Sequence, residues 1–178
     1  MGRDATRAAE LIAGLTSATF DEITDYVRGQ PALVELSFPR SLMIYAHAAL
    51  FFERILGLQV GDGGFTEELS AATRARHVGY WHAHGAEHGF DVTDHDSIGK
   101  VFDAAQERIG PPVRAAIDRL VSGDQVQGQT DMIVSVMALV VEPPIREEDL
   151  VTHVAPLLQP YLSRVEPLMS FLQERDQA

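Results

Sequence analysis

Apolar residues recur through most of the chain at alternating steps of three and four positions, which is the spacing of one face of an α-helix. One such stripe contains Leu42, Tyr45, Ala49, Phe52 and Leu56. A second contains Ile98, Val101, Phe102, Ala105 and Ile109. The strict alternation typical of half-buried strands is absent from the sequence. The pattern therefore predicts an all-α protein.

Local signals predict where the helices begin and end. The segment from Thr19 to Glu22 has the form of a capping box, which predicts a helix start. Pro111 and Pro112 suit the first turn of a new helix, because the N–H that proline lacks has no helical partner there. The expected helices span about residues 4–16, 19–29, 39–58, 66–88, 94–109, 111–122, 129–141, 147–158 and 160–174.

The length and composition predict one globular domain, and they narrow its partners. The 178 residues suffice for one sizeable core, so we expect a single helical domain over 1–178. Fourteen basic against twenty-six acidic residues give a net charge of -12, which argues against binding to nucleic acid or to an anionic membrane. The chain has no cysteine, so disulfides and thiolate metal sites are excluded. No apolar run approaches the roughly 18 residues that span a bilayer, and we expect a cytoplasmic protein.

Histidines are the residue type with the clearest chemical potential. Four of the seven, His77, His82, His84 and His88, lie within twelve residues. His84 and His88 have the spacing that can place two imidazoles on one metal ion. Glycines interrupt the same stretch, so a solvated helix end with incidental histidines is the alternative.

His47 has a different setting, in a helix from Leu42 to Phe52 that is apolar nearly all round. Such a helix is expected to be buried. A buried imidazole needs a partner, which can be a backbone carbonyl, a carboxylate, a metal ion or a ligand. Two histidines on different helices could also face each other across a flat apolar cofactor.

The order of these features resembles a globin over about residues 19–122. The stretch Gln30–Phe38 is similar to the globin segment that begins at the proline of the C helix and ends at the phenylalanine packed on haem. His47 follows Phe38 by nine residues, where bacterial globins carry the distal histidine or glutamine, and Phe51 lies one turn further on. His84 then matches the proximal iron ligand, since His88, Phe90 and Ile98 follow it at the globin spacing.

The proximal position stays open between two histidines. His77 lies thirty residues after His47, closer to the usual globin separation than the thirty-seven of His84, whereas Tyr80 and Trp81 give His84 an apolar preceding turn. The resemblance implies haem iron held by His84 or His77, with His47 as a distal donor or a second ligand. The implied pocket residues are Phe38, His47, Phe51, Tyr80, Trp81, Phe90 and Ile98. Residues 124–178 would form a C-terminal helical extension.

The function that follows from the resemblance is binding or sensing of a diatomic gas, O2 or NO, at a histidine-ligated iron. The sequence has no Gly-x-Gly-x-x-Gly dinucleotide motif, so a complete reductase within this chain is excluded. Whether the chain is an enzyme stays open.

Two other hypotheses belong to different classes. The first is a haem-free helical sensor domain that binds an apolar ligand and acts as a homodimer. Its dimer face would be a C-terminal stripe, which equally suits packing on the chain's own core: Leu158, Tyr161, Val165, Leu168 and Leu172. The second is a metalloenzyme that uses His77, His84 and His88 with Glu87 or Asp94, although the His-Glu-x-x-His motif is missing.

Overall fold

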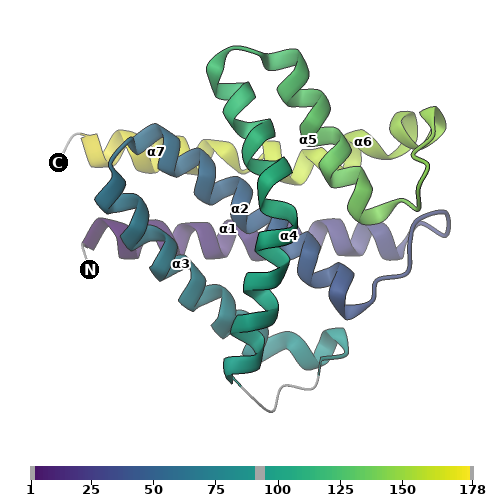
Figure 1. Cartoon of the computed structure of the whole chain (residues 1–178), viewed down its shortest axis with the longest axis horizontal. Coiled ribbons are helices and arrows are strands. Elements are labelled where there is room, and N and C mark those ends of the chain that lie inside the picture. The colour runs from purple at the N-terminus through teal and green to yellow at the C-terminus, as the bar shows by residue number, and fades with distance from the viewer. Residues whose placement is uncertain (1–2, 91–94, 177–178) are drawn as a thin grey trace.

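The structure is a computed structural model that describes residues 3–90 and 95–176, and every regular element within them is a helix (Figure 1). This confirms the predicted all-α class. The elements are α1 (Arg3–Arg28), α2 (Phe38–Val60), α3 (Gly63–His84), the short 3-10 helix η1 (Gly85–His88), α4 (His95–Ser122), α5 (Gln125–Val140), α6 (Glu147–Leu162) and α7 (Val165–Asp176).

Helix α2 is the centre of the fold, because it contacts α1, α3, α4, α5 and α7. Its residues from Leu42 to Phe52 are buried almost without interruption, as the apolar pattern predicts. By length and composition α2 could cross a membrane, but 67% of its most apolar window is buried inside the fold. A buried core helix of this kind is compatible with a soluble protein.

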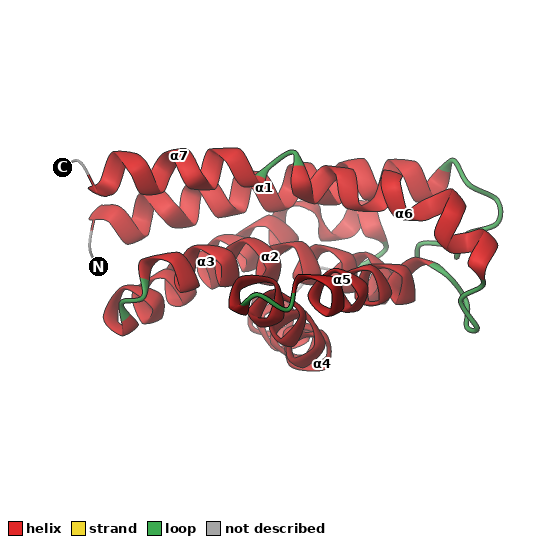
Figure 2. Ribbon diagram, turned by 90° about the horizontal axis from the view of Figure 1, so that it is seen from above, coloured by secondary structure: helices red, strands yellow, loops and turns green. Residues whose placement is uncertain are grey.

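The other helices are arranged on opposite sides of α2. Figure 2 shows α1 beside α6 and α7 in one layer, with α4 at the opposite face of the molecule. The beginning of α1 and the end of α7 lie close to each other (Figure 1). Arg7 of α1 forms an ion pair with Glu174 of α7 there. One connected hydrophobic cluster draws residues from all seven α-helices.

Two of the predicted breaks between helices do not exist in the structure. Helix α1 continues through Thr19, whose buried hydroxyl donates to the Pro160 carbonyl at 3.4 Å and so joins α1 to α6. Helix α4 continues through Pro111 and Pro112. Both prolines are exposed, so water can reach the carbonyl groups that lose a helical partner there.

Two local features fix the start of α3 and the close packing of α4 on α5. The Asp62 carboxylate accepts hydrogen bonds from the backbone N–H groups of Gly64 and Phe65 and thereby caps α3. Helices α4 and α5 approach closely at Gly128, where a Cβ would lie 2.7 Å from the Leu120 backbone nitrogen. Glycine is therefore required at this crossing, which lies beside the cavity described below.

Candidate functional site

Two of the three histidines that are buried in the described residues, His47 and His77, lie on opposite sides of α2; the third is His153 on α6. On one side, the Tyr45 hydroxyl is 3.1 Å from Nδ1 of His77 on α3. On the other side, Nδ1 of His47 is 2.8 Å from the Tyr161 hydroxyl on α6, and Nε2 is 3.0 Å from Oγ of Ser135 on α5. Tyr45 and His47 are two residues apart, which is about 200° around a helix axis. The structure therefore does not place His47 and His77 across a shared space.

The other predicted ligands are also apart from His47. His84 ends α3 with a side chain that is 46% exposed, and its Nδ1 lies 3.4 Å from a Glu87 carboxylate oxygen. The His88 ring on η1 is half-buried between the rings of Phe20 and Trp81. In residues 3–90 and 95–176 no three histidine, aspartate or glutamate side chains are placed to hold a metal ion. Asp94, named in the metalloenzyme hypothesis, lies outside the described residues.

The predicted haem-pocket residues divide into two groups. Phe38 stacks on Phe90 with ring centroids 4.3 Å apart and meets Trp81 at 5.6 Å. Tyr80 packs against Trp81 in this same group. His47 and Phe51 form the second group, in which both rings contact Tyr161. Ile98 is buried on α4.

These residues do not fit the two-sided site that a haem group requires. The globin resemblance implies an open flat space between His47 and a proximal imidazole, that of His77 or His84. Both ring nitrogens of His47 already have hydrogen-bond partners. The Trp81 ring is enclosed by other aromatic rings, including those of Phe20, Phe38 and Tyr45. The arrangement therefore gives no support for iron ligation between these histidines.

Burial sets the charge of the two core histidines. It lowers the pKa of His47 to about 3, and it lowers the pKa of His77 to about 3 as well, since the protonated ring would lose its hydration. Both rings are neutral at neutral pH. Within the described residues, Nε2 of His77 and Nε1 of Trp81 are buried without a hydrogen-bond partner.

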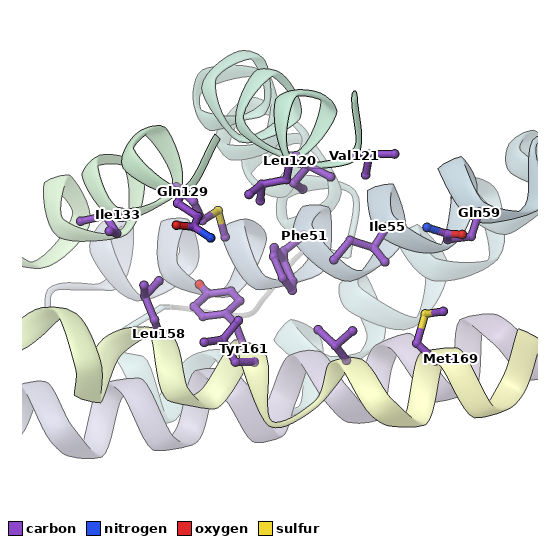
Figure 3. Close-up of a pocket in the computed structure, with 14 residues that line it drawn as sticks. Phe51, Ile55, Gln59, Leu120, Val121, Gln129, Ile133, Leu158, Tyr161 and Met169 are labelled. Atoms are coloured by element: carbon purple, nitrogen blue, oxygen red, sulfur yellow. The ribbon is translucent and has the colours of Figure 1, made fainter. Parts of the chain in front are cut away.

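A cavity of about 430 Å³ lies beside the His47 group, between α2, α4, α5, α6 and α7. Figure 3 shows its lining, in which Gln129 and Gln59 lie toward opposite ends. The lining contains no charged residue. It consists of Phe51, Ile55, Gln59, Ile117, Leu120, Val121, Gln129, Met132, Ile133, Leu158, Tyr161, Leu162, Val165 and Met169.

The mouth of this cavity exposes apolar side chains. Val121 is 52% exposed, Leu162 is 62% exposed and Met169 is 38% exposed. Large apolar side chains that remain exposed around a concavity are typical of a binding surface. We call this space, with the lining given above, the apolar cavity.

A second cavity of about 540 Å³ lies between α4 and α5 and has a different character. Arg108, Arg119 and Asp131 contribute to its lining, and the last two form an ion pair with each other. Ser135 also lines it, so the hydrogen bonds of His47 reach from the apolar cavity to this second one. Charged groups paired across it make it a poorer site for an apolar molecule.

The C-terminal stripe packs within its own chain. Tyr161, Leu168 and Leu172 are buried in the core, and Leu158 and Val165 pack against it. Those side chains are therefore largely used inside the fold, and a dimer through this stripe stays a prediction. The helical spacing of the apolar residues placed Tyr161 on this stripe, but that spacing did not predict its contact with His47. A signal was present, since a buried tyrosine hydroxyl and a buried imidazole each require a partner.

Comparisons with other proteins do not assign the chain to a family. No protein-family model, no curated protein and no solved structure matches this chain.

Proposed function

We propose that this chain is a haem-free helical domain that binds a small, largely apolar molecule in the apolar cavity. The observation that carries the proposal is an uncharged lining that opens to solvent through exposed Val121, Leu162 and Met169. Leaving these side chains in water is unfavourable, and an apolar ligand would remove part of their surface from it.

The size and chemistry of the cavity support this proposal. Small-molecule sites commonly occupy about 300–1,000 Å³, with mostly apolar walls and a few polar groups that orient the ligand. The apolar cavity, at about 430 Å³, has three such polar side chains in its lining, Gln59, Gln129 and Tyr161. They come from α2, α5 and α6, so the site depends on the tertiary packing of three helices.

The globin-like alternative has weaker support. It requires the imidazoles of His47 and of His77 or His84 to share one space, whereas their hydrogen bonds and contacts lie on different sides of α2. The apolar-ligand proposal needs no rearrangement of these contacts. The apolar-ligand proposal keeps the ligand-binding part of the sensor hypothesis that arose from the sequence. It does not depend on a dimer through the C-terminal stripe.

Binding of a neutral fluorescent probe tests the proposal. N-phenyl-1-naphthylamine should bind saturably, with an increase in fluorescence as it leaves water. Val121→Phe narrows the mouth of the cavity and should weaken binding at least fivefold. Val151→Phe is the matched control, because Val151 is 80% exposed on α6 and does not line the apolar cavity.

The proposal fails if the unmodified chain gives no saturable binding. It also fails if the two phenylalanine variants bind the probe equally well, because the probe would then lie elsewhere. Circular dichroism spectra of both variants establish that any loss of binding does not come from loss of the fold.

A further inference from the structure

The hydrogen bonds at His47 form a chain with a defined direction. Oγ of Ser135 donates to the backbone carbonyl of Met132 at 2.8 Å, which uses the only proton of that hydroxyl. The contact of 3.0 Å between Oγ and Nε2 of His47 therefore requires Nε2 to carry the proton and to donate. A neutral imidazole has one N–H, so Nδ1 is an acceptor.

The same direction continues to Tyr161. Since Nδ1 of His47 is an acceptor, the Tyr161 hydroxyl must donate to it across 2.8 Å. That hydrogen bond uses the only proton of the phenol and leaves lone pairs on the oxygen. Tyr161 lines the apolar cavity, and Figure 3 shows its hydroxyl on the side nearer Gln129. The oxygen of this cavity-lining residue therefore has lone pairs that can accept a hydrogen bond, whereas its proton is already donated to His47.

The charge state of this group supports the same conclusion. Burial raises the pKa of Tyr161 far above its ordinary value of 10.0, so the hydroxyl keeps its proton. Because the lining contains no charged residue, a charged ligand would lose its hydration without finding an ion-pair partner.

We infer that the ligand of the apolar cavity is an uncharged, mainly apolar compound that carries a hydroxyl or N–H group and donates it to the Tyr161 oxygen. The inference depends on the proposed function, because it specifies the ligand of the same cavity. A ligand whose polar group only accepts, such as an ether or a ketone, forms no hydrogen bond with the Tyr161 oxygen and has only the amide N–H groups of Gln59 and Gln129 as donors in the lining. His47 and Ser135 are positioning residues, since they fix the direction of the Tyr161 hydroxyl without touching the ligand.

Two isomeric probes of equal size test the inference. Octan-1-ol has a hydroxyl donor, whereas 1-methoxyheptane has the same atoms in an ether that only accepts. Each would be titrated against bound N-phenyl-1-naphthylamine. We expect octan-1-ol to displace the probe with about fivefold to tenfold higher affinity, which is the usual contribution of one hydrogen bond.

The variants separate Tyr161 from the general properties of the two probes. Tyr161→Phe should abolish the preference for the alcohol. Tyr26→Phe is the matched control, because it removes a hydroxyl that lies 2.7 Å from Nδ1 of His153 and lines none of the apolar cavity. The preference should persist in this control.

The tautomer of His47 gives a second test that needs no variant of Tyr161. Nitrogen-15 NMR of the ring should show the proton on Nε2. A proton on Nδ1 would overturn the inference, because Tyr161 would then accept from His47 and could donate to a ligand.

The outcomes distinguish this inference from the proposed function. If both isomers displace the probe equally from the unmodified chain, or the ether is stronger, the inference is wrong and the cavity proposal stands. If N-phenyl-1-naphthylamine itself does not bind, the proposed function fails and the inference falls with it. If Tyr161→Phe does not fold, two measurements on the unmodified chain still test the inference. They are the ratio of the affinities for octan-1-ol and 1-methoxyheptane and the tautomer of His47.

Discussion

Tyr45 and His47 lie two residues apart on α2 and bind polar groups on opposite sides of that helix. Tyr45 pairs with His77 of α3, whereas His47 pairs with Tyr161 of α6 and Ser135 of α5. A central helix that is apolar nearly all round thus carries at least these two buried polar side chains, each with a partner on another helix. The apolar cavity thus lies on the His47 side of α2, whereas the cluster of aromatic rings around Trp81 lies on the Tyr45 side.

We expect the free energy of unfolding to fall as the pH is lowered from about 6.5 toward 3. The ordinary pKa of histidine is 6.5, whereas burial lowers the pKa of His47 and of His77 to about 3. Below pH 6.5 the unfolded chain therefore binds protons that the folded chain excludes. His77→Leu removes one of these sites and should reduce the slope by about 1.4 kcal/mol per pH unit in the acid range.

Urea unfolding between neutral and acid pH measures this slope. Phe102→Leu is the control, because Phe102 is buried against His77 but does not titrate. Its effect on the free energy of unfolding should be the same at each pH. An unchanged slope in His77→Leu would contradict the assignment of a neutral buried ring.

The globin resemblance predicts haem binding, and a visible spectrum tests that prediction. From the structure we expect the opposite result: added haemin should give no absorption band that depends on His77 or His84, because neither ring shares a space with His47. Spectra of the unmodified chain, His77→Leu and His84→Ala would be compared. A histidine-ligated spectrum that is lost in only one variant would restore the globin hypothesis and identify the proximal ligand.

We expect Gly128→Ala to lower the free energy of unfolding by about 1–3 kcal/mol, the usual cost of overpacking. The new Cβ would lie 2.7 Å from the Leu120 nitrogen and 2.9 Å from the Ala116 carbonyl oxygen, and backbone atoms cannot move aside cheaply. Gly14→Ala is the matched control, since a Cβ at Gly14 on α1 meets nothing within 4 Å.

Thermal or urea unfolding of both variants measures the difference. Gly14→Ala should stabilise the chain by about 0.5–1 kcal/mol, because alanine is the better helix former. Equal effects of the two substitutions would show that α4 and α5 are not packed as closely as described.

We expect Pro111→Ala to raise the free energy of unfolding by about 1–3 kcal/mol. Pro111 is exposed in the interior of α4, where it removes a backbone hydrogen bond and crowds the preceding turn. Alanine restores the bond and meets no packed neighbour on the exposed side. Urea unfolding measures the effect, and a decrease in stability would mean that the packing of α4 depends on the proline.

The helical period of the apolar residues was enough to predict the fold class. It also predicted that the helix around His47 is buried, because a helix apolar on every face has to be surrounded by other helices. Local signals were less reliable. The capping-box pattern at Thr19 and the prolines at 111–112 both predicted helix boundaries where the helix continues. Packing of α1 against α6 uses the Thr19 hydroxyl, and exposure of the prolines makes their missing N–H groups tolerable.

The candidate site could not be predicted to the same extent. The sequence by itself determined that His47 is buried and needs a partner, because its apolar neighbours remove it from water. Only the tertiary structure decided that the partners are Tyr161 and Ser135, which lie 114 and 88 residues away along the chain. Hydrophobic periodicity specifies which face of a helix is buried, but the crossing of α2 with α5 and α6 determines which polar groups meet there.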